Sequence, residues 1–311
     1  MRPGIGASDS AGSEPTSTNT TPPSATQPAS TETSGLGTWI NGAANFGAYD
    51  AYRQAAGFDS DNIAVSTGVD QRISEHALIG LSLGYNHDNS EINNDGTRSV
   101  AQGYTAALYG SYQPAAHVYL DGVIGGGGLS FDSSRYAADS GTDLLGHRNG
   151  DQWFASLTAG YEYQTGVWSM SPYGRFAWSL SSLNSFSENG DAADALTYGA
   201  QTVRTSQAIA GVRASGKIPW SDAMLIPHVR LEIGHDFQGT SNTALSYAFI
   251  PSAGSWSVLT NPYTANGTSV QASFGGDLQL RNNLLITTEY EYLLMPHAHD
   301  QSIRLSVQKQ F

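Results

Sequence analysis

Apolar and polar residues alternate with a period of two from Gly37 to the C-terminus. Between Ala77 and Tyr85, one parity carries Ala, Ile, Leu, Leu and Tyr, and the other carries only Leu78, Gly and Ser. The same alternation recurs at 100–112, 153–163 and 270–280. Because successive side chains on a strand point to opposite faces, each segment predicts a β-strand with one apolar face and one polar or small face.

About twelve strands are predicted, and several exceed the roughly 9–11 residues that a bilayer-crossing strand needs. Their ranges are 37–49, 62–73, 77–87, 99–113, 117–131, 151–164, 168–186, 198–216, 223–237, 268–281, 284–294 and 300–311.

The connections between these strands alternate in length. The short ones are Ser74–His76, Pro114–Ala116, Thr165–Gly166, Ile218–Asp222 and Asn282–Asn283. The long ones are Asp50–Asp61, Asp88–Arg98, Asp132–Gly150, Ser187–Thr197 and Gln238–Gly267, and the last join, Met295–Asp300, breaks the rhythm. Short periplasmic turns and long outer loops are typical of outer-membrane barrels. The pattern predicts an all-β, transmembrane, antiparallel up-and-down barrel with both chain ends on the periplasmic side.

Composition supports a membrane barrel over other classes. Only 13% of the 311 residues are charged, about half the usual share of a soluble domain. No run approaches the ~18 apolar residues of a spanning helix, and the mean hydropathy is −0.30. The absence of Cys suits export through an oxidising periplasm. A net charge of −13 argues against nucleic acid as a partner.

Residues 1–36 differ sharply from the rest. They are rich in Ser, Thr, Pro, Ala and Gly with almost no large apolar side chain, which predicts a disordered linker before a barrel domain at 37–311. The start, Met1–Gly4, has no apolar signal-peptide core behind it. We therefore expect the sequence to be a mature fragment or a domain of a longer protein.

Charged residues inside the strands alternate with apolar neighbours. On the lipid face near mid-bilayer such a charge costs about 2–4 kcal/mol, so this parity predicts that they line the interior. The predicted pore-lining residues are Asp70, Arg72, Asp121, Glu162, Arg175, Arg213, Arg230, Glu232, Asp277, Glu289, Glu291 and Arg304. Folding back at the last join predicts Glu291 opposite Arg304. Such a lumen is either a polar conduit or the filled interior of a small barrel, and the conduit is favoured.

No catalytic or cofactor site is predicted. His87-Asp88 and His235-Asp236 stand at loop-side strand ends, but adjacent residues on a strand face opposite ways and form no ready dyad. His297, His299 and Asp300 crowd the last hairpin without the further ligands that a metal needs. Acidic residues are frequent in the long loops, where solvent or outer-leaflet lipopolysaccharide with its divalent cations would meet them.

The segment from about Thr38 to Phe311 resembles the autotransporter β-domain of type V secretion. The resemblance rests on "GTWINGAANFGAYD", "NIAVSTGVDQRI" and "ALIGLSLGYNHDNSEI" near the start. It continues in "VRLEIGHDFQG", "SYAFIPSAGSWSV", "SVQASFGGDLQLRNNLLITTEYEYLL" and "SIRLSVQKQF" near the end. The order and spacing of these motifs cover about nine-tenths of the chain.

The resemblance implies a twelve-stranded translocator whose N-terminal linker crosses the pore and holds a passenger outside. It also implies insertion by the outer-membrane barrel machinery, which reads the last strand. Here Phe311 matches the terminal aromatic of that signal, and Ile303, Leu305 and Val307 share its lipid-facing parity, whereas Lys309 departs from the usual apolar residue. The family usually carries a lumenal helix before the first strand, whereas residues 1–36 are predicted to be disordered. A weak helix could extend through Gly35–Ala48, but the four Gly of that segment oppose it. Two alternatives stay open: a passive porin or adhesin barrel acting through its loops, and a barrel hydrolase.

Overall fold

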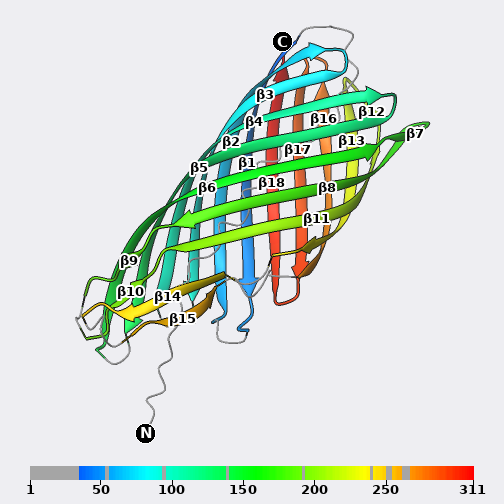
Figure 1. The fold of residues 1–311 in the computed structure, drawn as a ribbon. Coiled ribbons are helices and arrows are strands. Elements are labelled where there is room, and N and C mark those ends of the chain that lie inside the picture. The colour runs from blue at the N-terminus through cyan, green and yellow to red at the C-terminus, as the bar shows by residue number, and fades with distance from the viewer. Residues whose placement is uncertain are drawn as a thin grey trace.

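The computed structural model forms a closed antiparallel barrel (Figure 1). It describes residues 35–52, 56–92, 96–137, 140–190, 193–238, 241–249, 254–260 and 267–311. The wall consists of β1 (Leu36–Tyr49), β2 (Phe58–Ser74), β3 (Ala77–Ile92), β4 (Thr97–Ala115), β5 (Val118–Ala137), β6 (Thr142–Tyr161), β8 (Trp168–Leu183), β11 (Gln201–Gly216), β13 (Ala223–Asp236), β16 (Thr268–Leu280), β17 (Leu284–Met295) and β18 (Ala298–Gln310). The short strands β7 (Tyr163–Thr165) and β12 (Ile218–Trp220) continue β6 and β11.

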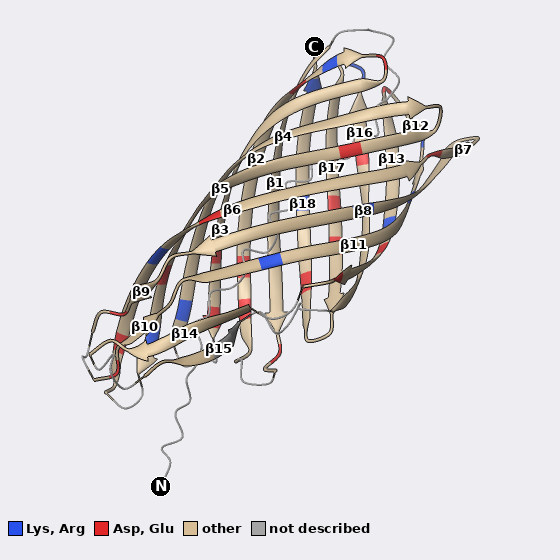
Figure 2. Cartoon of the chain, viewed as in Figure 1, with Lys and Arg blue, Asp and Glu red and all other residues tan. Residues whose placement is uncertain are grey.

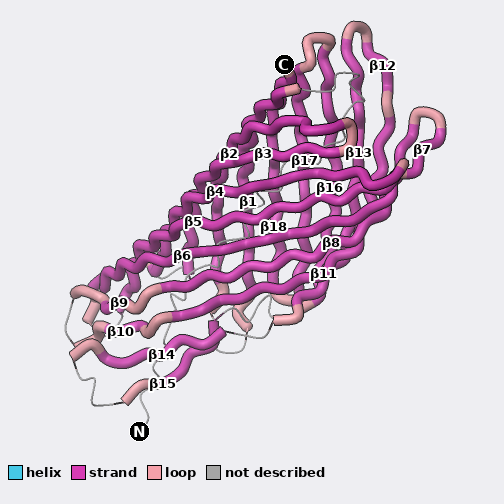
Figure 3. Tube along the Cα trace, turned by 45° about the horizontal axis from the view of Figure 1, so that its top comes forward, coloured by secondary structure: helices cyan, strands magenta, loops and turns pink. Residues whose placement is uncertain are grey.

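Each wall strand pairs with its neighbour in sequence, and β1 pairs with β18 to close the ring. The β1–β18 join has thirteen register pairs, from Gly37–Gln310 to Tyr49–Ala298. The predicted twelve-stranded all-β barrel is therefore confirmed. Figure 3 shows only strand and loop over the described residues. Within that part of the chain, no helix is long and apolar enough to cross a membrane.

The two ends of the barrel differ, and we call them the turn end and the loop end. The turn end carries the tight connections after β2, β4, β7, β12 and β16. Several of these turns hold a residue with positive φ, as at His117 (68°) and Ser221 (53°), which two-residue hairpins commonly require. The described chain also begins and finishes there, because the amide of Phe311 donates to the carbonyl of Leu36.

At the loop end, two predicted loops are wrong. Most of 88–98 and 132–150 is strand, because β3, β4, β5 and β6 continue to Ile92, from Thr97, to Ala137 and from Thr142. Along these extensions polar residues such as Asp132 and His147 replace most of the apolar outward residues, so the alternation that marks a membrane strand is weakened there. The join before β18 is also tighter than predicted, since Met295 pairs with Ala298 across Pro296 and His297.

A second sheet forms from two other predicted loops. It contains β9 (Phe186–Ser187), β10 (Leu196–Tyr198), β14 (Ser241–Tyr247) and β15 (Trp256–Thr260), in the order β15-β14-β10-β9. We call it the cap sheet. In Figure 1 it lies at the loop end, beside the long tips of β5 and β6 and below β11.

The linker predicted at 1–36 lies outside the described residues except for Gly35 and Leu36, and β1 begins at Leu36. The weak helix considered from Gly35 onward is a strand, because Gly-rich β1 pairs with a strand on each side.

Glycines let large interior rings lie close to the wall. A Cβ on Gly80 would stand 2.3 Å from Cζ of Tyr109, and one on Gly68 would stand 2.6 Å from Cε2 of Trp39. The rings therefore occupy space that any other residue at these two positions would fill.

Candidate functional site

Alternation along β13 shows the two sides of the wall. Val229, Leu231 and Ile233 are 52%, 58% and 54% exposed, whereas Arg230 and Glu232 are 7% and 5% exposed. In a closed barrel the exposed parity faces outward, so the ionic residues face inward. Figure 2 shows how thinly charged residues are spread over the strands.

The twelve predicted pore-lining residues all lie on the buried or half-buried parity. Those in strands are Asp70, Arg72, Asp121, Arg175, Arg213, Arg230, Glu232, Asp277, Glu289, Glu291 and Arg304, and Glu162 lies at the break between β6 and β7. Their functional role as a pore lining stays a prediction.

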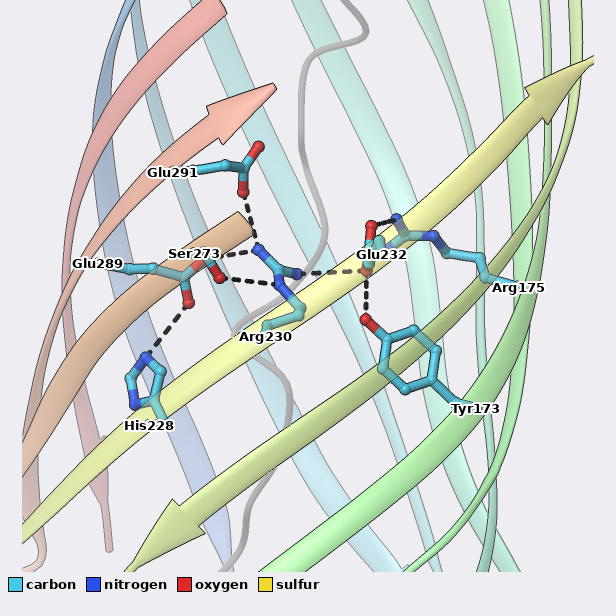
Figure 4. A network of polar contacts seen from close by, with 8 residues as sticks. All are labelled: Tyr173, Arg175, His228, Arg230, Glu232, Ser273, Glu289 and Glu291. Atoms are coloured by element: carbon cyan, nitrogen blue, oxygen red, sulfur yellow. Dashed lines mark hydrogen bonds and ion pairs between the residues drawn. The ribbon is translucent and has the colours of Figure 1, made fainter. Parts of the chain in front are cut away.

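Arg230 is the centre of an interior ionic network (Figure 4). Its Nη2 donates to Oε1 of Glu289 at 2.6 Å and to Oε2 of Glu291 at 2.8 Å. Its Nε donates to Oγ of Ser273 at 3.1 Å, and its Nη1 lies 3.8 Å from Oε1 of Glu232. One guanidinium thus contacts three carboxylates from β13 and β17.

Glu232 extends the network in the other direction around the wall. Nη2 of Arg175 donates to its Oε2 at 2.7 Å, and the hydroxyl of Tyr173 donates to its Oε1. Both partners come from β8, and β11 passes between with Gly211. A Cβ on Gly211 would stand 2.5 Å from Cζ of Tyr173, so glycine makes room for the crossing.

His228 completes the network near Asp277. Its Nε2 lies 3.3 Å from Oε2 of Glu289, and its Nδ1 lies 3.7 Å from Oδ2 of Asp277. Thr287 donates to Asp277 at 2.7 Å. The network therefore links β8 to β17 across five adjacent strands, and it brings four carboxylates to Arg175, Arg230 and His228.

The predicted pairing of Glu291 with Arg304 is wrong by two residues. Glu291 lies opposite Ser302 and bonds Arg230, whereas Glu289 lies opposite Arg304. The tight turn at Pro296–His297 lengthens β18 by two residues and shifts the register accordingly.

A smaller interior cluster lies on the β1–β4 side. Nε1 of Trp39 donates to the hydroxyl of Tyr109 at 2.6 Å, and that hydroxyl donates to Oδ2 of Asp70 at 3.0 Å. Asp70, which was predicted to face the interior, thus accepts a hydrogen bond from the hydroxyl of Tyr109, and the sequence analysis did not predict Tyr109 as part of the site. The sequence feature that could have indicated Tyr109 is Gly80, which lies opposite it on β3.

The cap sheet is fixed to the barrel by buried polar contacts. Arg135 Nε and Nη2 donate to the carboxylate of Glu188 at 2.8 and 2.6 Å, and Glu188 also accepts from the amide of Leu196 at 3.0 Å. The cap also joins β6 through the bridge between Leu145 and Asn189. Burial disfavours the charged form of Arg135. The hydrogen bonds and the negative charge of Glu188 outweigh this effect and raise the pKa of Arg135.

Arg148 lies nearby in the same extension. Its guanidinium carbon is 5.1 Å from the ring centre of Phe131 and 5.6 Å from that of Phe186. Burial lowers the pKa of Arg148 to about 10. Sequence analysis missed this cluster, because it placed Arg135, Arg148 and Glu188 in loops.

In each His-Asp dipeptide, the aspartate is buried in the wall and the histidine has the opposite parity. Asp88 is fully buried and accepts from Ser60 at 2.6 Å and Ser90 at 2.8 Å, while His87 has the opposite parity. The ring of His297 stacks on that of Tyr52, with centroids 3.7 Å apart. In the described segments, no group of three or more His, Cys, Asp or Glu has the geometry to hold a metal.

A closed antiparallel barrel with an apolar outward face and a polar, ion-paired interior defines an integral outer-membrane β-barrel. The model of the family described as the autotransporter beta-domain matches residues 38–291. The chain belongs to this family, whose function is passenger export, and it is an outer-membrane translocator barrel.

Solved structures of translocators share the fold. The translocator domain of autotransporter NalP from Neisseria meningitidis superposes with a TM-score of 0.73, at 18% identity over 91% of each chain. The β domain of the Bordetella autotransporter BrkA gives a TM-score of 0.67, at 16% identity over 90% of this chain and all of that one.

Curated relatives extend well beyond the matched region. Esterase EstA from Pseudomonas aeruginosa is 23% identical over 275 residues, which are 85% of this chain and 41% of that protein. YaiT from Escherichia coli K12, named a putative uncharacterized protein, is 26% identical over 191 residues, 60% of this chain and 19% of its own length. The chain thus spans less than half the length of these relatives.

Proposed function

We propose that the chain anchors an N-terminal passenger in the outer membrane and helps to export it through the polar lumen. The observation that carries this proposal is the Arg230 network, in which four interior carboxylates contact Arg175, Arg230 and His228. A lumen whose carboxylates are ion-paired offers hydrogen bonds along its wall without a strong attraction that would hold an exported chain. Such a surface suits the passage of many sequences.

We place the turn end in the periplasm and the loop end outside the cell. Short turns are typical of the periplasmic side of such barrels. In this orientation Gly35 and Phe311 both lie on the periplasmic side. A chain upstream of Gly35 then has to cross the lumen to reach the surface.

The partners follow from this placement. They are the outer-membrane lipid with its lipopolysaccharide, the barrel insertion machinery, and a passenger outside this chain, and we propose no nucleic-acid partner. Ile303 and Leu305 are 57% and 52% exposed toward lipid, and Phe311 is 70% exposed at the strand end, where Val307 is half-buried. These side chains are available to an assembly factor.

We propose no enzymatic step and no cofactor for the barrel itself. The family that the chain matches is a transport barrel. The esterase activity in the name of EstA belongs to that protein, of which this chain covers less than half.

A second candidate is an adhesin or passive porin barrel that acts through its loops. The observation in its favour is the cap sheet, whose buried Arg135–Glu188 pair gives the loop end a fixed shape. A binding surface needs such order.

Surface display distinguishes the two candidates. A reporter domain fused upstream of Met1, with a signal peptide, is expected to become accessible to protease on intact cells. The matched control is the same reporter with its signal peptide but without the barrel, which should stay protected in the periplasm. A reporter upstream of Met1 that stays protected while the barrel is assembled would favour the loop-acting alternative.

Charge reversal in the network is expected to change ion conduction. Arg230→Glu or Glu232→Lys places like charges side by side in the lumen and alters the local field that a permeating ion meets. Single-channel conductance in planar bilayers measures this effect. Asp132→Lys is the control, because Asp132 lies on the outer face with its side chain 65% exposed. Equal conductance in all variants would show that the network does not line the ion path.

A further inference from the structure

Arg148 on β6 is a buried cation for which the described residues provide no ion pair. It has the inward parity and is 6% exposed. Its Nη1 donates to Oε1 of Gln201 at 3.4 Å, which is longer than the usual range of about 2.7–3.2 Å. No carboxylate of the described ranges forms an ion pair with it. Arginine is almost never buried unless it is paired, so the guanidinium lacks the counter-charge that its burial requires.

Glu188, the buried carboxylate of the same joint between β6 and the cap sheet, is already occupied. It accepts two hydrogen bonds from Arg135, at 2.8 and 2.6 Å. It also accepts from the amide of Leu196 at 3.0 Å and from the hydroxyl of Tyr198 at 3.3 Å. A carboxylate offers about four lone-pair positions. Glu188 therefore has no acceptor left for Arg148.

Two aromatic rings flank Arg148 and supply part of what the missing anion would supply. Phe131 lies opposite it on β5, and Phe186 comes from β9 of the cap sheet. Figure 1 shows β6 and β9 converging at the loop end, where Leu145 and Asn189 form a bridge. Aromatic rings attract a positive charge, but they do not accept the N–H groups of the guanidinium fork as an oxyanion does.

The unused N–H groups of Arg148 are within reach of a small solute. The fully buried side-chain atoms that lack a hydrogen-bond partner in the described part of the chain include no nitrogen of Arg148. Its nitrogens that do not bond Gln201 therefore keep some contact with the surroundings.

The two arginines of the joint respond differently to similar surroundings. The carboxylate of Glu188 raises the pKa of Arg135, whereas burial lowers the pKa of Arg148 to about 10. The difference follows from the counter-charge, which Arg135 has and Arg148 lacks.

We infer that Arg148 is a binding site for a small oxyanion, a carboxylate or phosphate group, at the joint between β6 and the cap sheet. The planar fork of a guanidinium binds both groups through two parallel hydrogen bonds. The inference goes beyond the proposed function and does not depend on it, because the site belongs to the cap sheet and needs no exported passenger.

The bound anion would strengthen the attachment of the cap sheet. Arg148 and Phe131 belong to the wall, and Phe186 belongs to the cap. Opening of the cap withdraws Phe186 and exposes the guanidinium to water, which weakens its attraction for an anion. An anion that prefers the closed cap shifts the equilibrium toward it.

Calorimetric titration of the full chain in detergent tests binding directly. Sodium acetate and inorganic phosphate are titrated separately, with chloride keeping the ionic strength constant. Saturable binding of at least one ion is expected, at least tenfold weaker in Arg148→Gln. Arg148→Lys keeps the charge without the fork and is expected to bind less tightly than the wild type. Arg204→Gln is the matched control, because Arg204 is exposed on β11, and it should bind as the wild type does.

A cysteine in the cap sheet reports whether the anion closes the cap, and the chain has no native Cys to interfere. Thr243 on β14 is 4% exposed, so a maleimide reaches Thr243→Cys when the cap opens. Labelling is expected to slow about tenfold at an ion concentration ten times its Kd. Phosphate also stabilises folded proteins without a specific site, and the Arg148→Gln background measures that contribution.

Two results would overturn the site. One is the absence of saturable binding of either ion to the wild type, and the other is equal binding by Arg148→Gln with the heat-modifiable barrel retained. In chloride alone, Arg148→Gln should label Thr243→Cys no faster than the wild-type background, because it removes a buried charge without a partner. Faster labelling there, with no effect of either ion on the wild type, would show that Arg148 acts only through its ring contacts.

Discussion

Replacing Arg230 with Met is expected to destabilise the barrel by about 3–5 kcal/mol, because it leaves buried carboxylates without their counter-charge. Glu291 would lose its ion pair, Glu289 would keep His228, and Glu232 would keep Arg175. The free energy of unfolding in denaturant, read from the heat-modifiable band on gels, measures the loss.

Arg281→Ala is the control for that experiment. Arg281 bonds Asp222 at 2.5 Å, but both side chains are 77% exposed at the turn end. Exposed ion pairs contribute little, so no measurable change is expected. Similar effects of the two variants would mean that burial does not govern the strength of the Arg230 network.

Deleting Phe311 is expected to remove most of the assembled barrel from the outer membrane. The Phe311 amide bonds the Leu36 carbonyl where the ring closes, and its ring contributes the terminal aromatic. The amount of heat-modifiable barrel in outer-membrane fractions measures assembly.

Lys309→Ala separates the terminal ring from its neighbour. Lys309 bonds the carbonyl of Asn282, and its ammonium lies 5.9 Å from the centre of the Phe311 ring. Both contacts are exposed, so this variant should assemble normally. Normal assembly of the Phe311 deletion as well would contradict a role for the last residue.

The strands, and the side of the wall to which each residue points, were predictable because lipid on one side and a polar interior on the other select alternating apolar and polar residues. Residues such as Leu231 meet lipid while Arg230 meets the interior, and a period of two records both. The short turns were predictable for a related reason, since polar and glycine residues interrupt the alternation at Gly166 and Asn282–Asn283.

The loop end was not predictable from the same signal. Beyond the bilayer the outward face of β5 and β6 meets water, so Asp132 and His147 replace apolar residues, and a strand looks like a loop. The cap sheet depends on pairings between segments far apart in sequence, such as Leu196 with Tyr247. No local pattern in either segment specifies that contact.

Within the candidate site, the alternation along each strand predicted which side chains face the interior, but it did not predict which of them form hydrogen bonds or ion pairs with one another. Arg230 was placed inside, yet its bonds to Glu289 and Glu291 depend on the pairing of β13 with β16 and on the turn at Asn283 that joins β16 to β17. Tyr173 and His228 were missed, because an aromatic ring or an imidazole inside a strand gives no pattern of its own.

The join between β1 and β18 is the one place where neighbouring strands are not covalently linked, since these are the first and last strands of the chain. It carries thirteen register pairs, whereas the β16–β17 and β17–β18 hairpins carry ten and twelve. The closing join has as many register pairs as the β13–β16 join, which a loop connects, and fewer than the 20 of β5–β6, so backbone pairing of ordinary extent holds this seam. The strand pairs with fewer register pairs, such as β16–β17, are consecutive in sequence. The loop that connects them limits how far the two strands can separate.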